Sequence, residues 1–178
     1  MSSFLHYLVI IINDLLQVTT DESKRIRENT DDKRLGVKYG PGDCDIVDIY
    51  GEKGNRSSQV MVYLSGGYWQ ELSGEISSYT VQPLLSGGHT VVVGHYTRCP
   101  GQDMEAIVDQ VTRLVRWTLE DYARPRHLSL VLSGHSAGSH LCAMVLTSDW
   151  FRSLSPEDAG LLTGVVHLSG TLLVIELK

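Results

Sequence analysis

The chain has 178 residues, of which 42% are hydrophobic and 20% are charged, and this composition predicts one soluble globular domain with a single core. Its 15 Lys and Arg against 21 Asp and Glu give a formal net charge of −6, which argues against a nucleic-acid-binding protein because such proteins present basic side chains to phosphates. The 3 cysteines lie far apart without a C-x-x-C pair, so we expect neither disulfides nor a metal site and favour the cytoplasm.

The first 43 residues differ from the rest, and we expect residues 1–43 to form a helical and charged N-terminal segment. The apolar stretch 4–12 is too short to cross a bilayer and lacks the preceding Lys or Arg of a signal peptide. It therefore predicts no membrane association and favours a packed helix or a removable leader. Acidic and basic side chains balance within residues 21–34, which is typical of a solvated helix or a linker.

From residue 44 onward apolar strands alternate with helices, which predicts a partial α/β domain over residues 44–178. Residues 45–50 alternate between polar and apolar side chains, as a half-exposed strand does. Residues 103–122 carry an apolar stripe with helical spacing. Short continuous apolar runs predict buried strands at residues 60–64, 90–93, 128–132 and 165–168, and two further helices are expected near residues 81–87 and 136–146. This order indicates a mostly parallel sheet with helices on both faces and ligands at the carboxyl ends of its strands.

A G-x-S-x-G motif stands between one of these strands and the helix that follows it. Residues 134–138 read Gly-His-Ser-Ala-Gly after the strand LSLVL, the context that a nucleophile elbow requires. The sharp turn holds the serine in a strained backbone conformation, and small flanking residues avoid a clash. Ser136 is therefore the candidate nucleophile, and the amide of Ala137 at the helix start is a candidate oxyanion donor. The alternative is a Gly/Ser-rich turn without chemistry.

A glycine-rich loop follows the earlier strand at residues 60–64. Enzymes with this elbow place their second oxyanion donor in such a loop, so Gly66 and Gly67 are candidates for that role. Tyr68 and Trp69 come next in the chain and offer flat surfaces to an aromatic substrate. The alternative is a turn followed by two core aromatic residues.

The segments GGYWQ, MEAIVDQVTRLVRW and SGHSAGSHLCAM followed by SDW resemble the kynurenine formamidases (arylformamidases), which are enzymes of the α/β-hydrolase fold. The likeness runs from about residue 45 to residue 170. It implies a serine hydrolase that converts N-formyl-L-kynurenine to kynurenine and formate in tryptophan catabolism without a cofactor. It also implies that Ser136 attacks the formyl carbon, that Gly66, Gly67 and Ala137 donate to the oxyanion, and that the partner is a small aromatic formamide.

Two features depart from the pattern of the family. Where the family usually has His before Gly-Gly, this chain has Ser65, which keeps the backbone donors but removes the ordering by an imidazole. The family's acid and catalytic His follow the nucleophile in a later part of the chain, and only 42 residues follow Ser136 here. Among the nearby histidines, we expect His140 to pack on its helix, His167 to lie in a buried strand and His135 to point away from the site.

These departures predict a C-terminally truncated chain that lacks the last strands of its sheet. We expect it to have low or no turnover, because losing triad members costs about 10⁴–10⁶ in kcat. Two alternatives stay open: a non-catalytic relative that only binds aromatic ligands or partner chains, and a carboxylesterase of the same fold. The strand at residues 165–168 would form an exposed sheet edge, which leaves room for a homo-oligomer.

Overall fold

The computed structural model of the protein describes residues 2–54 and 57–170, with side chains from residue 13 onward. In this part of the chain a six-stranded sheet runs in the order β1-β2-β4-β3-β5-β6. Its strands are β1 (Lys33–Lys38), β2 (Ile46–Tyr50), β3 (Gln59–Leu64), β4 (Thr90–Gly94), β5 (Ser129–His135) and β6 (Leu162–Leu168). The strands β4, β3, β5 and β6 are parallel, whereas β2 is antiparallel to both β1 and β4. The predicted mostly parallel sheet is therefore confirmed.

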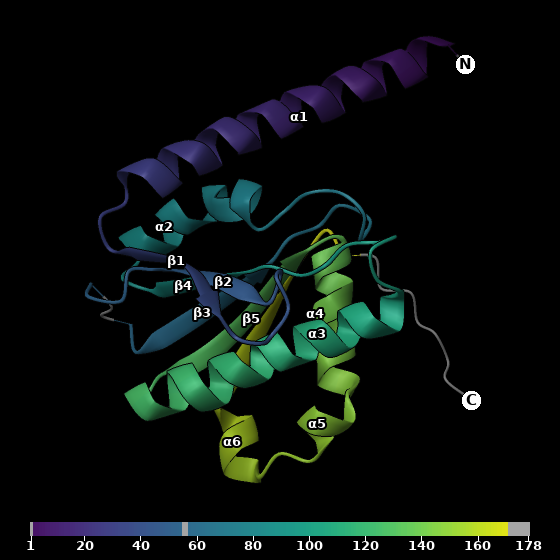
Figure 1. Cartoon of the computed structure of the whole chain (residues 1–178). Coiled ribbons are helices and arrows are strands. Elements are labelled where there is room, and N and C mark those ends of the chain that lie inside the picture. The colour runs from purple at the N-terminus through teal and green to yellow at the C-terminus, as the bar shows by residue number, and fades with distance from the viewer. Residues whose placement is uncertain (1, 55–56, 171–178) are drawn as a thin grey trace.

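Helices cover both faces of the sheet (Figure 1). On one face lie α1 (Ser2–Asn29) and α2 (Val81–Ser86), and on the other lie α3 (Met104–Trp117) and α4 (Ala137–Thr147). The remaining helical segments are η1 (Glu75–Thr80), η2 (Thr118–Ala123), η3 (Arg124–Arg126), α5 (Asp149–Arg152) and α6 (Pro156–Leu161). The expected helices near residues 81–87, 103–122 and 136–146 are thus present, although the second of them changes to a π-helix at Thr118.

Two apolar clusters fill the space between the layers. The larger one joins the sheet to α3 and α4, with Leu114, Leu132 and Leu141 fully buried. The smaller one joins it to α1 and α2 and includes Ile26 and Val81. Burying these side chains is the main stabilising term for such a layered fold. No helix in the described ranges combines the length and the apolar character that crossing a bilayer requires.

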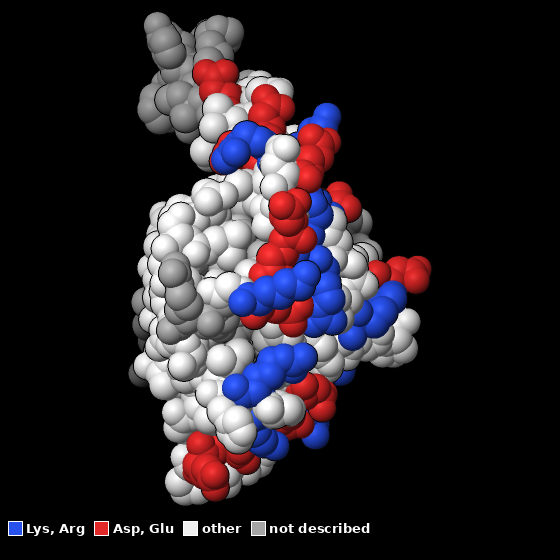
Figure 2. Space-filling model, turned by 90° about the vertical axis from the view of Figure 1, so that its left-hand side faces the viewer, with Lys and Arg blue, Asp and Glu red and all other residues white. Residues whose placement is uncertain are grey.

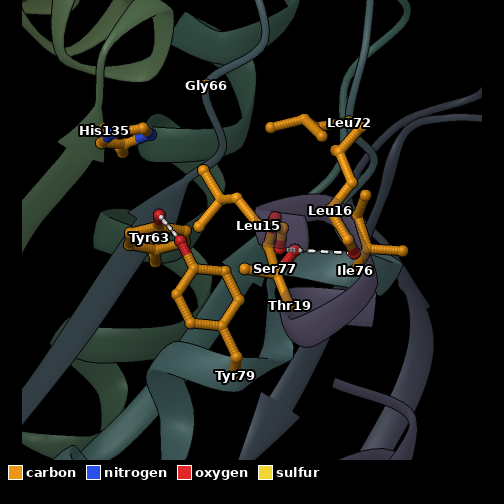
Figure 3. A pocket seen from close by; sticks show the side chains of 10 residues that line it. All are labelled: Leu15, Leu16, Thr19, Tyr63, Gly66, Leu72, Ile76, Ser77, Tyr79 and His135. Carbon is orange, nitrogen blue, oxygen red and sulfur yellow. Dashed lines mark hydrogen bonds between the residues drawn. The ribbon is translucent and has the colours of Figure 1, made fainter. Parts of the chain in front are cut away.

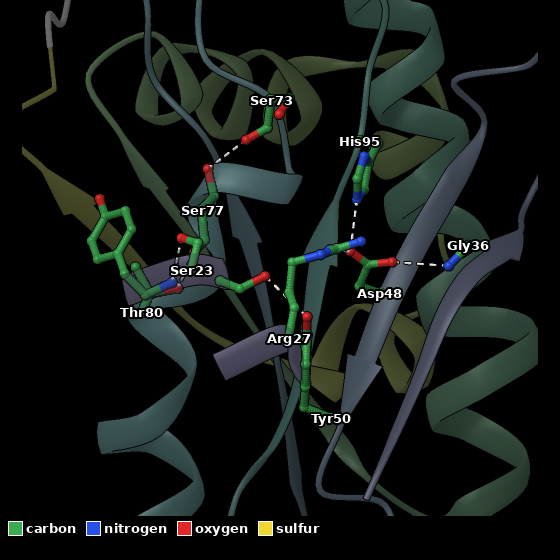
Figure 4. Close-up of polar contacts among 11 residues, drawn as sticks. Ser23, Arg27, Gly36, Asp48, Tyr50, Ser73, Ser77, Thr80 and His95 are labelled. Carbon is green, nitrogen blue, oxygen red and sulfur yellow. Dashed lines mark hydrogen bonds and ion pairs between the residues drawn. The ribbon is translucent and has the colours of Figure 1, made fainter. Parts of the chain in front are cut away.

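A buried polar cluster fastens α1 to the sheet (Figure 4). The carboxylate of Asp48 on β2 is 1% exposed, forms an ion pair with Arg27 of α1, and lies 3.0 Å from Nε2 of His95. The amide of Gly36 on β1 donates to its other oxygen at 2.9 Å. One turn away on α1, the hydroxyl of Ser23 accepts a hydrogen bond from the amide of Tyr79. We call Arg27, Asp48 and His95 the α1 anchor.

Three sequence expectations differ from the structure. The strand β2 is buried rather than half-exposed, because Asp48 finds its charged partners inside the fold. The strand β6 is partly exposed rather than buried, with His167 at the surface, because no other strand in the described part of the chain lies beyond it. Residues 21–34 are not wholly solvated, since α1 buries Ser23 and Ile26.

The sheet also begins before residue 44, where the sequence analysis divided the chain. The strand β1 precedes that point and pairs with β2, so the segment 1–43 contributes both a strand and a helix to the layered structure. Residues 171–178, which belong to the expected second segment, lie outside the described residues.

Candidate active site

Ser136 occupies a sharp turn between β5 and α4. Its backbone has φ 49° and ψ −113°, a conformation that residues with a side chain rarely adopt and that costs about 1–3 kcal/mol. The amide of Ser136 donates to the carbonyl of Leu168 at the end of β6, at 2.9 Å. The fold thus holds a strained serine at the carboxyl edge of the parallel sheet, where α/β proteins bind ligands.

The flanking glycines allow β3, β5 and α4 to approach one another closely. A Cβ on Gly138 would collide with the carbonyl oxygen of Leu64, and one on Gly134 would collide with the backbone of Gly138. Because these neighbours are backbone atoms, they could move only if an element of the core moved with them. The spacing of the G-x-S-x-G motif is therefore a steric requirement of this junction.

The glycine-rich loop after β3 lies beside Ser136. A Cβ built on Gly66 would lie 3.2 Å from the Cβ of Ser136. Gly67 has φ 103° and its carbonyl accepts hydrogen bonds from Gln70 and Glu71, which closes a turn. Among the described residues, nothing accepts a hydrogen bond from the amides of Gly66, Gly67 or Ala137. The structure therefore places Gly66 beside the predicted nucleophile Ser136, with Gly67 and Ala137 as their neighbours in the chain.

Ser65, at the position of the family's usual His, is 2% exposed. Its carbonyl accepts a hydrogen bond of 2.9 Å from the hydroxyl of Tyr96, a residue just beyond β4. This bond fixes the start of the loop from the side of the neighbouring strand. Tyr96 was not among the predicted site residues, and its only signal in the sequence was a position at the carboxyl end of a predicted strand.

The structure separates the two predicted aromatic contacts. Tyr68 is 78% exposed and projects from the loop. Trp69 is half-buried, and its ring packs edge-on against the imidazole of His140, with 5.2 Å between ring centroids. Its indole Nε1 is buried and has no hydrogen-bond partner within the described residues. Trp69 thus joins the loop to α4, and Tyr68 lies at the surface.

The three histidines near the elbow have different environments. His140 lies one turn after Ser136 on α4, where burial lowers the pKa of its imidazole and favours the neutral form. Its Nδ1 is buried and has no partner in the described ranges. His167 on β6 is exposed, and His135 lines a cavity behind Gly66. No hydrogen bond between an imidazole and the Ser136 hydroxyl is present in residues 13–54 and 57–170.

Charge is mixed rather than segregated on the face shown in Figure 2. Acidic and basic side chains alternate along a band there. Ion pairs at the surface of the molecule include Arg34 with Glu52 and Arg25 with Glu22. Within the described residues, no group of three His, Cys, Asp or Glu side chains is arranged to hold a metal ion.

Similarity to known proteins agrees with this geometry. The chain matches no established protein-family model. It is 39% identical over 139 residues to kynurenine formamidase from Salmo salar, an overlap of 75% of this chain and 46% of the relative. The chain belongs to the kynurenine formamidase family. The kynurenine formamidase of Danio rerio is 37% identical over 143 residues, which is 78% of this chain and 48% of that protein. The chain thus spans about half the length of these formamidases.

A solved structure supports the fold. A protein from Silicibacter sp., provisionally described as a thioesterase, superposes with a TM-score of 0.74 at 26% identity, covering 89% of this chain and 58% of that one. Together with the strand order, this confirms the α/β-hydrolase-type fold that the resemblance to the formamidases implied.

Proposed function

We propose that the chain is a serine hydrolase of the kynurenine formamidase type, which hydrolyses N-formyl-L-kynurenine to kynurenine and formate in cytoplasmic tryptophan catabolism. The observation that carries the proposal is the strained backbone of Ser136 beside unpaired amide donors, in a chain whose relatives are named kynurenine formamidase. Acyl transfer to a serine needs no cofactor.

The proposed reaction follows from the positions of these groups. The Ser136 oxygen attacks the formyl carbon, and the negative charge that develops on the carbonyl oxygen is stabilised by the amides of Gly66, Gly67 and Ala137. The bond from carbon to the aryl nitrogen then breaks, the nitrogen takes a proton, and water hydrolyses the formyl-serine to formate. Tyr68 and Trp69 follow this loop directly, so we assign them contacts with the substrate at the mouth of the site.

The base that takes the Ser136 proton decides the rate. Among the described residues, His140 is the histidine that lies one turn after Ser136 on α4. Its ring packs on Trp69. A serine without an oriented base stays protonated and is a poor nucleophile. We therefore propose slow turnover for the chain, about 10⁴–10⁶-fold below an enzyme with a complete triad.

Turnover of N-formyl-L-kynurenine by the purified chain tests the function directly. We expect slow formation of kynurenine, followed by its absorbance, that is lost in Ser136→Ala. Equal rates in the two proteins would contradict the proposal. Faster hydrolysis of p-nitrophenyl acetate than of the formamide would instead favour the carboxylesterase of the same fold.

We also propose that two copies of the chain associate through β6. Its outer edge pairs with no strand in the described part of the chain, and Val166 and Leu168 are 40% and 45% exposed there. Such an edge is a template for pairing. Sedimentation of the wild type as a dimer and of Val166→Lys as a monomer is the expected result, and a monomeric wild type would contradict it.

A further inference from the structure

A cavity of about 150 Å³ lies directly behind the candidate oxyanion loop (Figure 3). Gly66 and His135 form its wall on the side of the elbow, whereas Leu15, Leu16 and Thr19 of α1 form another wall. A Cβ built on Gly66 would lie 2.8 Å from Nδ1 of His135 and 3.2 Å from the Cβ of Ser136. The cavity therefore reaches His135, the residue before the proposed nucleophile, and α1 lines another side of it.

The lining of this cavity selects for a neutral aromatic group. Leu72 and Ile76 add to the two leucines of α1, and none of the described residues that line it is an Asp, Glu, Lys or Arg. An apolar cavity of about this volume accommodates a molecule the size of benzene. A charged group would lose its hydration here without gaining an Asp, Glu, Lys or Arg as a counter-charge among the described lining residues.

Two tyrosines supply the cavity with one hydrogen-bond donor. The hydroxyls of Tyr63 and Tyr79 lie 3.2 Å apart and share one hydrogen bond. Each hydroxyl carries one hydrogen, so a second hydrogen remains for a group inside the cavity. Tyr79 is held in place from α1, because the hydroxyl of Ser23 accepts the hydrogen bond of its amide at 3.0 Å.

We infer that this cavity binds the aromatic ring of the formamide substrate and that the tyrosine pair donates a hydrogen bond to a carbonyl carried by that ring. N-formyl-L-kynurenine has such a carbonyl next to its formamide. The assignment of the ring to the substrate rests on the proposed function, whereas binding of a neutral aryl ketone to the cavity does not. In this account α1 is part of the binding site, with Leu16 and Thr19 setting its size.

Binding of fluorinated probes to the full chain, followed by ¹⁹F NMR, tests this inference without any need for turnover. Fluorobenzene and 4-fluoroacetophenone both fit the volume, and only the second carries a carbonyl. We expect both to bind the wild type, with Leu16→Trp weakening both at least tenfold because indole fills the cavity. Val18→Trp is the matched control, since Val18 lies on the same helix, is 65% exposed and does not line the cavity.

A second variant tests the donor. The double variant Tyr63→Phe/Tyr79→Phe removes both hydroxyls, since either one alone could still donate. It should weaken 4-fluoroacetophenone about fivefold, the equivalent of one net hydrogen bond, and change fluorobenzene less than twofold. If Leu16→Trp does not fold, Leu16→Ala should enlarge the cavity and improve binding of 1-fluoronaphthalene at least threefold over the wild type.

Absence of binding by both probes to the wild type, or equal binding by Leu16→Trp and Val18→Trp, would overturn the inference. An unchanged affinity for 4-fluoroacetophenone in Tyr63→Phe/Tyr79→Phe would overturn the role of the tyrosines. Probe binding as expected, together with no Ser136-dependent formation of kynurenine, would contradict the proposed function alone.

Discussion

The elbow around Ser136 and the α1 anchor are both strained or costly to form, but they are held together in different ways. The elbow is formed by residues close in sequence. In it, residues 134–138 pack against the end of β3 through backbone atoms, which come close because Gly134 and Gly138 have no side chain. The α1 anchor joins Asp48 to Arg27 and His95, which are 21 and 47 residues away in the sequence. Steric fit therefore determines the first region, and the pairing of buried charges determines the second.

Breaking the steric fit of the elbow should have the largest effect. Gly138→Ala places a methyl group against the carbonyl oxygen of Leu64, so α4 must move away from β3. We expect a loss of more than about 3 kcal/mol in the free energy of unfolding, measured by urea denaturation.

Gly160→Ala is the matched control for this substitution. Gly160 lies in the short helix α6, and a methyl group added there would have no neighbouring atom within 4 Å. Because alanine favours helices over glycine, this variant should gain about 0.5–1 kcal/mol. Equal effects of the two substitutions would show that the elbow is not sterically constrained.

Breaking the α1 anchor should have the next largest effect. Asp48→Asn keeps the shape of the side chain but leaves Arg27 without its buried counter-charge. We expect a loss of about 2–4 kcal/mol in the free energy of unfolding, measured by urea denaturation at neutral pH. A loss below about 0.5 kcal/mol would mean that the anchor does not hold α1 on the sheet.

The pH dependence of stability sharpens this test. Burial opposes ionisation of Asp48, but the hydrogen bond and charge of His95, the amide of Gly36 and the charge of Arg27 together lower the pKa of its carboxyl below the ordinary value. A carboxyl with a lowered folded pKa stabilises the protein above its unfolded pKa, which is about 3.9. This contribution is lost as the pH falls through the lower, folded value.

The difference in stability between the wild type and Asp48→Asn should therefore be constant from about pH 7 to pH 5 and shrink below about pH 4. Urea denaturation of both proteins across this range measures it, and taking the difference cancels the contributions of the other carboxyls, which the two proteins share. A difference that stays constant to about pH 3 would contradict the lowered pKa of Asp48.

The smallest effect is expected at a more exposed ion pair. Glu52 accepts two hydrogen bonds from Arg34, at 2.6 and 2.8 Å, and one from the hydroxyl of Tyr122. Because the Arg34 side chain is 48% exposed, water screens the pair. Glu52→Gln should cost about 1 kcal/mol or less by the same denaturation assay. A cost as large as that of Asp48→Asn would mean that burial is not what distinguishes the α1 anchor.

The sequence predicted the elbow because its determinants lie within five consecutive residues. The context of Gly134 and Gly138 around Ser136 already implied the strained turn that the structure shows. The alternation in residues 45–50 predicted the wrong exposure for β2, because the burial of Asp48 depends on partners that are distant in sequence. Local patterns can indicate an element but not the charges that surround it.

The role of α1 in the cavity was missed, although a signal was present. Leu16, Thr19, Ser23 and Ile26 recur at intervals of three and four residues, which places them on one helix face. The balanced charges of residues 21–34 instead indicated a solvated helix or a linker, so the buried face of α1 was not predicted. The sequence led to two expectations for residues 165–168, a buried strand that holds His167 and an exposed sheet edge, and in the described part of the chain β6 is the edge strand and His167 is exposed.

Labelling with a fluorophosphonate tests the central claim, that the fold presents Ser136 as the nucleophile of the site. The reagent reports reaction at the serine whatever the natural substrate is. We predict that the folded wild-type chain takes up one label slowly, because no oriented base activates the hydroxyl, that the label is found on Ser136 by mass spectrometry of its peptides, and that Ser136→Ala takes up none. Equal labelling of both proteins, or no labelling of a wild type shown to be folded by circular dichroism, would contradict the account.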